Sequence, residues 1–70
     1  MDKNTQLKLD KIFTNNFISI VNSEIYKNKY YLDLKKDDIV FSVNFTLLAL
    51  QQSSVKSLEK QIIKKYNKKL

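Results

Sequence analysis

The chain has no glycine and no proline at any of its 70 positions. Glycine supplies the positive-φ backbone conformations that tight hairpin turns favour, and proline interrupts helices. Turns between strands must therefore be built from other residues, whereas helices meet no interruption. These absences favour an all-α fold. We expect a single small domain over residues 1–70, because a chain of this length forms one domain at most.

Three segments have the hydrophobic spacing of amphipathic helices and predict a small three-helix bundle. The first spans residues 5–29, where apolar side chains fall within one arc of a helix. The second spans 34–52, where two apolar stripes predict burial on two sides. The third spans 54–68 and has the clearest pattern, with apolar residues on one face and lysines on the opposite face. Ser53 or Ser54 is a suitable residue to cap its first turn.

The segment 30–45 also fits a pair of β-strands. Residues 30–34 and 39–45 alternate in side-chain polarity and are rich in β-branched and aromatic residues, as strands are. They flank Lys35-Lys36-Asp37-Asp38, which contains two aspartates but no glycine, so the turn of a hairpin is poorly marked there. The alternative to the bundle is therefore an α+β fold, helix–β-hairpin–helix, with the hairpin near 30–45.

The residue types needed for most enzyme chemistry are missing. The chain has no histidine and no cysteine, which removes the commonest general base and the thiolate metal ligands. Without glycine it has no Gly-rich phosphate loop. The acids Asp33, Asp37 and Asp38 lack the spacing and the glycine of a calcium loop. We expect no catalytic activity, no cofactor and no metal site.

The sequence predicts neither a secretion signal nor a membrane span. The first residues lack the apolar stretch of a signal peptide. The longest apolar-rich run, residues 39–50, includes three polar residues and is too short to cross a bilayer. We expect a cytoplasmic protein without a membrane partner.

Positive charge is concentrated at the C-terminal end. The net charge of the chain is +6, and every basic residue is lysine. Lys56, Lys60, Lys64 and Lys68 are four residues apart, so on a helix they form one row that can neutralise phosphates. Lysine lacks the forked donor geometry with which arginine reads bases, so such a row would read sequence poorly. Residues 49–54 match a helix-turn-helix turn poorly.

The second predicted helix has more apolar surface than a small bundle can bury. Phe41, Phe45, Leu47 and Leu48 belong to this excess, and exposed apolar surface on a small domain usually marks an interface. We therefore expect a small regulatory or accessory protein that binds another protein, or a second copy of itself as a homodimer, through this surface. A nucleic-acid-binding regulator that uses the lysine row is the alternative.

Overall fold

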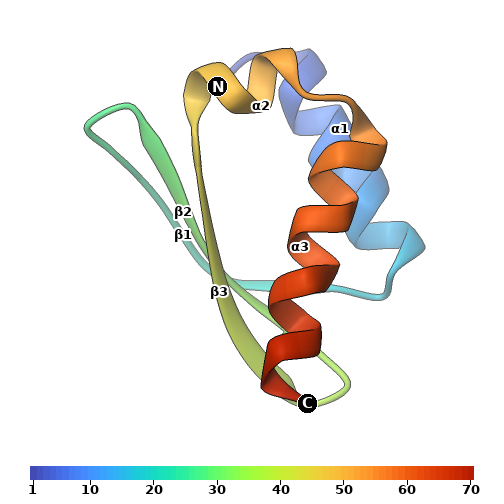
Figure 1. Cartoon of the computed structure of the whole chain (residues 1–70). Coiled ribbons are helices and arrows are strands. Elements are labelled where there is room, and N and C mark those ends of the chain that lie inside the picture. The colour runs from blue at the N-terminus through green and yellow to red at the C-terminus, as the bar shows by residue number, and fades with distance from the viewer.

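The computed structural model describes all 70 residues and contains three helices and three strands. In chain order these are α1 (Lys3–Asn15), β1 (Ser19–Tyr26), β2 (Lys29–Lys36), β3 (Ile39–Thr46), α2 (Leu47–Gln52) and α3 (Val55–Lys69). The strands form one antiparallel sheet in the order β1-β2-β3. Helices α1 and α3 pack together on one side of this sheet, and the short α2 connects β3 to α3 (Figure 1). The architecture is therefore α+β, in two layers.

The predicted all-α bundle is wrong, and the alternative with a β-hairpin comes closer. The segment 34–52, predicted as one helix, is extended up to Thr46 and helical only from Leu47. Phe41, Val43 and Phe45 are buried while their neighbours in β3 are exposed. A strand thus places all three on one face, whereas a helix would spread them around its surface.

The predicted helix over residues 5–29 is wrong beyond Asn15. The Asn16 side-chain amide donates to the carbonyl of Ile12 at 2.8 Å, and the next residue, Phe17, has a left-handed backbone with φ 55°. The following run is rich in β-branched residues, serine and asparagine, which are poor helix formers, and it forms β1. The third predicted helix is confirmed as α3, with Ser54 Oγ accepting a hydrogen bond from the Ser57 amide at 3.1 Å.

Both hairpins turn on two residues without glycine. Lys27 and Asn28 connect β1 to β2 with φ values of 48° and 63°, and Asp37 and Asp38 connect β2 to β3 with φ values of 51° and 65°. Two positive φ values in succession are the signature of the type I′ turn, whose twist matches that of the paired strands. Asparagine and aspartate tolerate this conformation better than most residues. The absence of glycine therefore did not exclude hairpins.

The core lies between the helices and two of the three strands. It contains fourteen buried apolar side chains, of which six come from β2 and β3 and none from β1. The six are Tyr30, Leu32, Leu34, Phe41, Val43 and Phe45. All eight residues of β1 are exposed. None of the three helices combines the length and the apolar run needed to traverse a bilayer.

One lysine is used inside the fold, where it fastens α1 to α2. Lys8 Nζ donates to the carbonyls of Leu50 at 2.6 Å, Gln51 at 3.1 Å and Ser53 at 3.0 Å. These carbonyls lie at the C-terminal end of α2, the negative end of its dipole, where a cation is stabilising. The ammonium group therefore satisfies backbone acceptors that a six-residue helix leaves unpaired.

Candidate nucleic-acid interface

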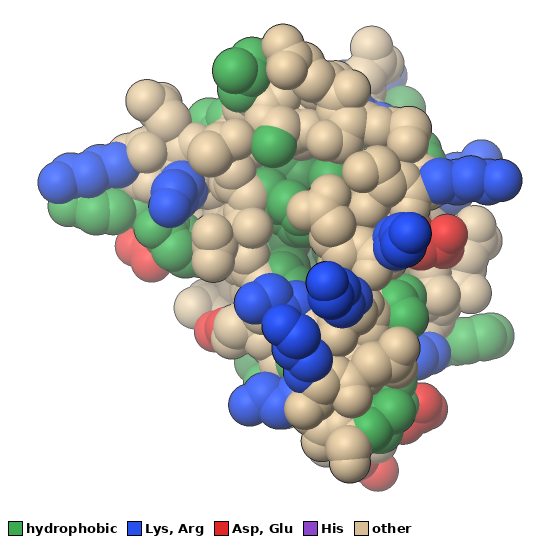
Figure 2. All heavy atoms as spheres, in the orientation of Figure 1, with side chains coloured by type: hydrophobic (Ala, Val, Ile, Leu, Met, Phe, Trp, Pro, Cys, Tyr) green, Lys and Arg blue, Asp and Glu red, His purple; other side chains and the backbone are tan.

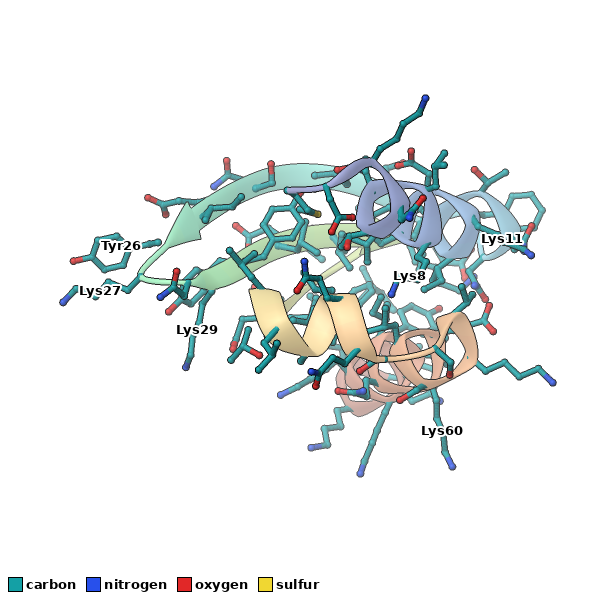
Figure 3. All side chains as sticks on the ribbon, turned by 90° about the horizontal axis from the view of Figure 1, so that it is seen from above. Lys8, Lys11, Tyr26, Lys27, Lys29 and Lys60 are labelled. Carbon is teal, nitrogen blue, oxygen red and sulfur yellow. The ribbon has the colours of Figure 1, made fainter.

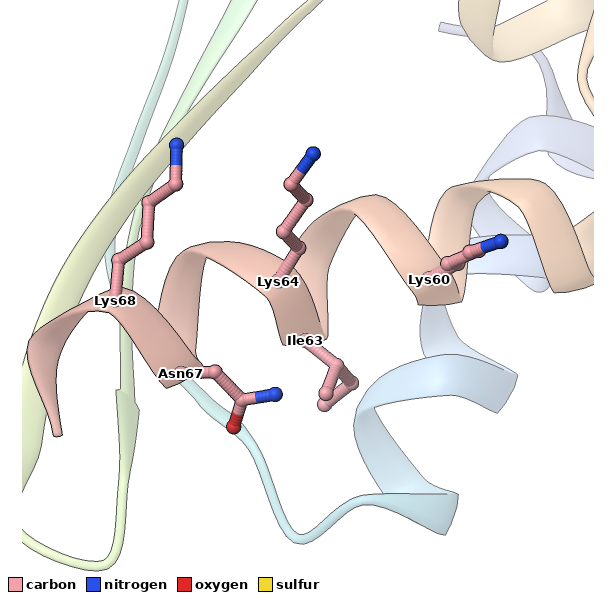
Figure 4. A pocket seen from close by; sticks show the side chains of 5 residues that line it. All are labelled: Lys60, Ile63, Lys64, Asn67 and Lys68. Carbon is pink, nitrogen blue, oxygen red and sulfur yellow. The ribbon is translucent and has the colours of Figure 1, made fainter.

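The four lysines of the predicted row come together on the outer face of α3. Lys56, Lys60, Lys64 and Lys68 are all exposed, and Figure 4 shows the last three spaced along the helix, with Ile63 and Asn67 beside them. At a rise of about 1.5 Å per residue, the row from Lys56 to Lys68 is about 18 Å long. The structure thus confirms the helical spacing on which the sequence-based prediction rested.

These ammonium groups have no partner within the chain. The single ion pair of the structure joins Lys35 to Asp38 at 3.8 Å and involves no residue of α3. The only acid on α3 is Glu59, which accepts a hydrogen bond from the Asn16 side chain at 2.7 Å. With Lys65 and Lys69 included, α3 carries six lysines and one acid. Their charge is therefore free to act on an external anion.

The inner face of α3 holds the row in place. Leu58, Ile62 and Tyr66 are buried against the sheet and α1. The Tyr66 ring meets the edge of Phe41 at 5.6 Å between centroids. Its hydroxyl donates to Asp37 Oδ2 at 2.9 Å, and this carboxylate acceptor raises the pKa of Tyr66 above its ordinary value. The helix is thus anchored along its length, and the lysines project from a rigid support.

Other lysines have structural roles and are not part of the candidate interface. Lys8 binds the three carbonyls described above, and Lys36 Nζ donates to the carbonyl of Asn16 at 2.6 Å while lying 5.6 Å from the Tyr66 ring centroid. Net charge alone does not separate these lysines from those on α3. Lys8 and Lys36 differ from the lysines on α3 because their ammonium groups bind backbone carbonyls of residues far away in the sequence.

Two further lysines lie outside the four-residue spacing of the row. Lys65 lines a small cleft with Gln61 and with residues 43–45 of β3. Lys29, next to the β1–β2 turn, points toward the same side of the molecule as Lys60, whereas Lys11 of α1 points elsewhere (Figure 3). In the space-filling view, lysines gather over the lower part of α3 (Figure 2). The helical period gave no sign of Lys29, because its place depends on the sheet.

The apolar surface predicted as a protein interface is divided by the fold. Phe41 and Phe45 are buried in the core, with 2% and 7% exposure, and so offer no surface to a partner. Leu47 packs against the core and is half-buried, while Leu48 is 60% exposed. The four residues therefore do not form one apolar patch, because strand alternation points both phenylalanines inward.

Comparisons with known proteins give no information on this site. No family model, no curated protein and no solved structure matches the chain. What the geometry offers is an exposed, unpaired row of primary ammonium groups on a well-anchored helix. Such a row can hold a chain of anions by charge.

Proposed function

We propose that this protein binds nucleic acid through the outer face of α3, with contacts to the phosphate backbone. The observation that carries the proposal is the row Lys56, Lys60, Lys64 and Lys68, exposed on one helix face and free of internal ion pairs. Each lysine that reaches a phosphate displaces condensed counterions, and this release drives association.

The length of the row suits a nucleic-acid strand. Successive phosphates of one duplex strand advance about 3.4 Å along the helix axis, so a row about 18 Å long extends along roughly five of them. Four lysines spaced over that length can contact separate phosphates. A single small anion would engage one or two of them and leave the others unused.

The chemistry of the row favours binding without sequence preference. Ammonium groups on flexible stems contact phosphates as point charges, and the protein has no arginine for bidentate contacts to guanine. We expect affinities for unrelated sequences of equal length to agree within a few-fold.

The proposal is tested by fluorescence anisotropy with a labelled duplex of about 20 base pairs across a salt series. Four phosphate contacts predict that log K falls against log[salt] with a slope near −3.6, about −0.9 for each contact. The charge-reversed variant Lys60→Glu/Lys64→Glu should lose at least tenfold in affinity, and its slope should become shallower by about 2.

The matched control is Lys3→Glu/Lys11→Glu, on exposed positions of α1. Both variants have the same net charge, because reversing two lysines lowers +6 by four to +2. We expect the control to retain most of the affinity. Equal losses in the two variants would contradict an α3 interface and leave only an effect of net charge. Absence of binding by the unaltered protein at low salt would refute the proposed function itself.

A further inference from the structure

The outer edge of the sheet at β1 is open. β1 pairs with β2 alone, and alternate residues of an antiparallel strand direct their backbone N–H and C=O groups to opposite sides. About half of these groups in β1 therefore face outward with no strand to receive them. An edge of this kind is a ready template for another strand.

The edge at β1 has few of the features that usually discourage pairing. Natural edge strands are blocked by lysine, proline or a covering element, yet residues 12–26 contain no lysine in a chain that has thirteen. Ile20, Val21, Ile25 and Tyr26 are between 43% and 57% exposed. One irregularity is present, a bulge at Val21, and it leaves the strand regular from residue 22 onward.

The other edge of the same sheet is protected. Helix α3 runs beside β3, and its Gln61 and Lys65 line a cleft with residues 43–45 of that strand. An incoming strand would meet a lysine and the flank of a helix there. Pairing is therefore available at β1 and obstructed at β3.

The charge distribution indicates which partner fits this edge. Two copies of the chain, each at +6, repel one another wherever lysines meet, and β1 is a strand from which lysine is absent. Its only charged residue is Glu24, so the edge attracts neither nucleic acid nor an acidic peptide. A second copy can bring its own lysine-free edge to this one.

A two-fold antiparallel pairing is also self-complementary. With Ser23 opposite its own copy, Asn22 lies across from the partner's Glu24, where an amide can donate to a carboxylate. Val21, the bulge residue, then lies near the partner's Ile25, and these apolar side chains are 57% and 48% exposed in a single copy. The same register keeps the two Glu24 carboxylates from facing each other directly.

We propose that the protein forms a homodimer in which β1 pairs antiparallel with β1 of a second copy. The two three-stranded sheets then become one sheet of six strands. The lysine row of α3 stays free in each copy, because α3 packs against β3 at the other edge. This proposal is independent of nucleic-acid binding.

Sedimentation equilibrium over a wide concentration range tests the proposal. The mass should rise from 8.3 kDa toward twice that value as concentration increases. Val21→Lys/Ile25→Lys places like charges on the pairing edge and should leave only monomer. The matched control Val40→Lys/Leu48→Lys adds the same charge on β3 and α2, at positions 52% and 60% exposed, and it should dimerise as the unaltered chain does.

Crosslinking tests the register directly. The chain has no cysteine, so any disulfide formed by Ser23→Cys must join two molecules, and the proposed pairing brings these thiols within bonding reach across the two-fold axis. Mild oxidation should give a covalent dimer much faster than with Ser42→Cys, an exposed position of β3. Monomer at every concentration, equal loss of dimer in both lysine variants, or equal crosslinking rates would overturn the proposal.

Discussion

Strands β1 and β3 are the two edges of the same sheet, each is eight residues long, and both contain several large apolar side chains. Every second residue of β3 from Phe41 to Phe45 is buried, whereas no residue of β1 is. The contrast shows that strand composition alone did not decide burial. The helices bury residues of β2 and β3 but none of β1, and β3 lies against α3 because α2 and α3 follow it directly in the chain.

The largest expected effect comes from matched truncations on the two strands. Phe41→Ala removes a ring that is 2% exposed and leaves a cavity in the core, so it should lower the free energy of unfolding by about 3–5 kcal/mol. Ile20→Ala, at a position 43% exposed on β1, should cost about 1 kcal/mol or less. Urea unfolding followed by circular dichroism measures both. Similar losses for the two variants would mean that β1 is covered as well as β3.

The second prediction concerns the hydrogen bonds that connect Lys8 of α1 to the C-terminal end of α2, the helix that follows β3. Lys8→Met keeps the length of the side chain but removes the donor to three carbonyls. A buried carbonyl left without a partner costs about 1–3 kcal/mol. Because the contacts of Lys8 are part-buried or exposed, we expect a loss near the low end of that range by urea unfolding. Lys11→Met, on an exposed position of the same helix, is the control and should change stability little. An equal loss in the control would show that the carbonyl contacts contribute nothing.

The smallest expected effect is a pH dependence at the far end of β3. The Asp37 carboxylate accepts the Tyr66 hydroxyl and raises the pKa of Tyr66 above its ordinary value of 10.0. The folded state thus favours the neutral phenol, so this contribution is complete below pH 10 and is lost as the pH rises through the raised pKa. Thermal melts between neutral and strongly alkaline pH should show this loss.

Tyr66→Phe separates the hydroxyl from the ring packing. The variant keeps the contact with Phe41 but has neither the hydrogen bond nor the ionisable group. It should be somewhat less stable than the unaltered protein at neutral pH, and its melting temperature should fall less steeply above pH 10. Parallel curves for the two proteins would exclude a role for the Asp37–Tyr66 hydrogen bond.

The sequence predicted an element correctly where its polar and apolar residues fit a helix but not a strand. The prediction failed where the same residues fit both structures. In α3, lysines and apolar residues alternate with a period that only a helix satisfies, so both the helix and its basic row could be foreseen. Leu9 and Phe13 share a helical arc with Ile20 and Val21, so the pattern gave no sign of the break after Asn15. At that break the Asn16 side chain donates both to the Ile12 carbonyl and to the carboxylate of Glu59, 43 positions further along the chain.

The proposed interface at Phe41 and Phe45 failed for a related reason. On a helix these residues would lie on a second apolar stripe that needs a partner, but on a strand they point to the same side as Val43 and fill the core. The open edge at β1 was not predicted, because residues 19–26 were expected to continue the first helix. The lysine-free stretch from 12 to 26 was the only trace of it in the sequence.

The two two-residue turns have a consequence for the order in which the elements fold. Each strand pairs only with its neighbour in the sequence, and hairpins with such short connections form within about 1–10 μs. The contacts of Lys8 with residues 50–53 and of Asn16 with Glu59 instead bring together residues more than forty positions apart. Closing so long a loop is entropically costly before the contacts form. We therefore expect the sheet to assemble first and the docking of α1 onto α2 and α3 to limit the folding rate.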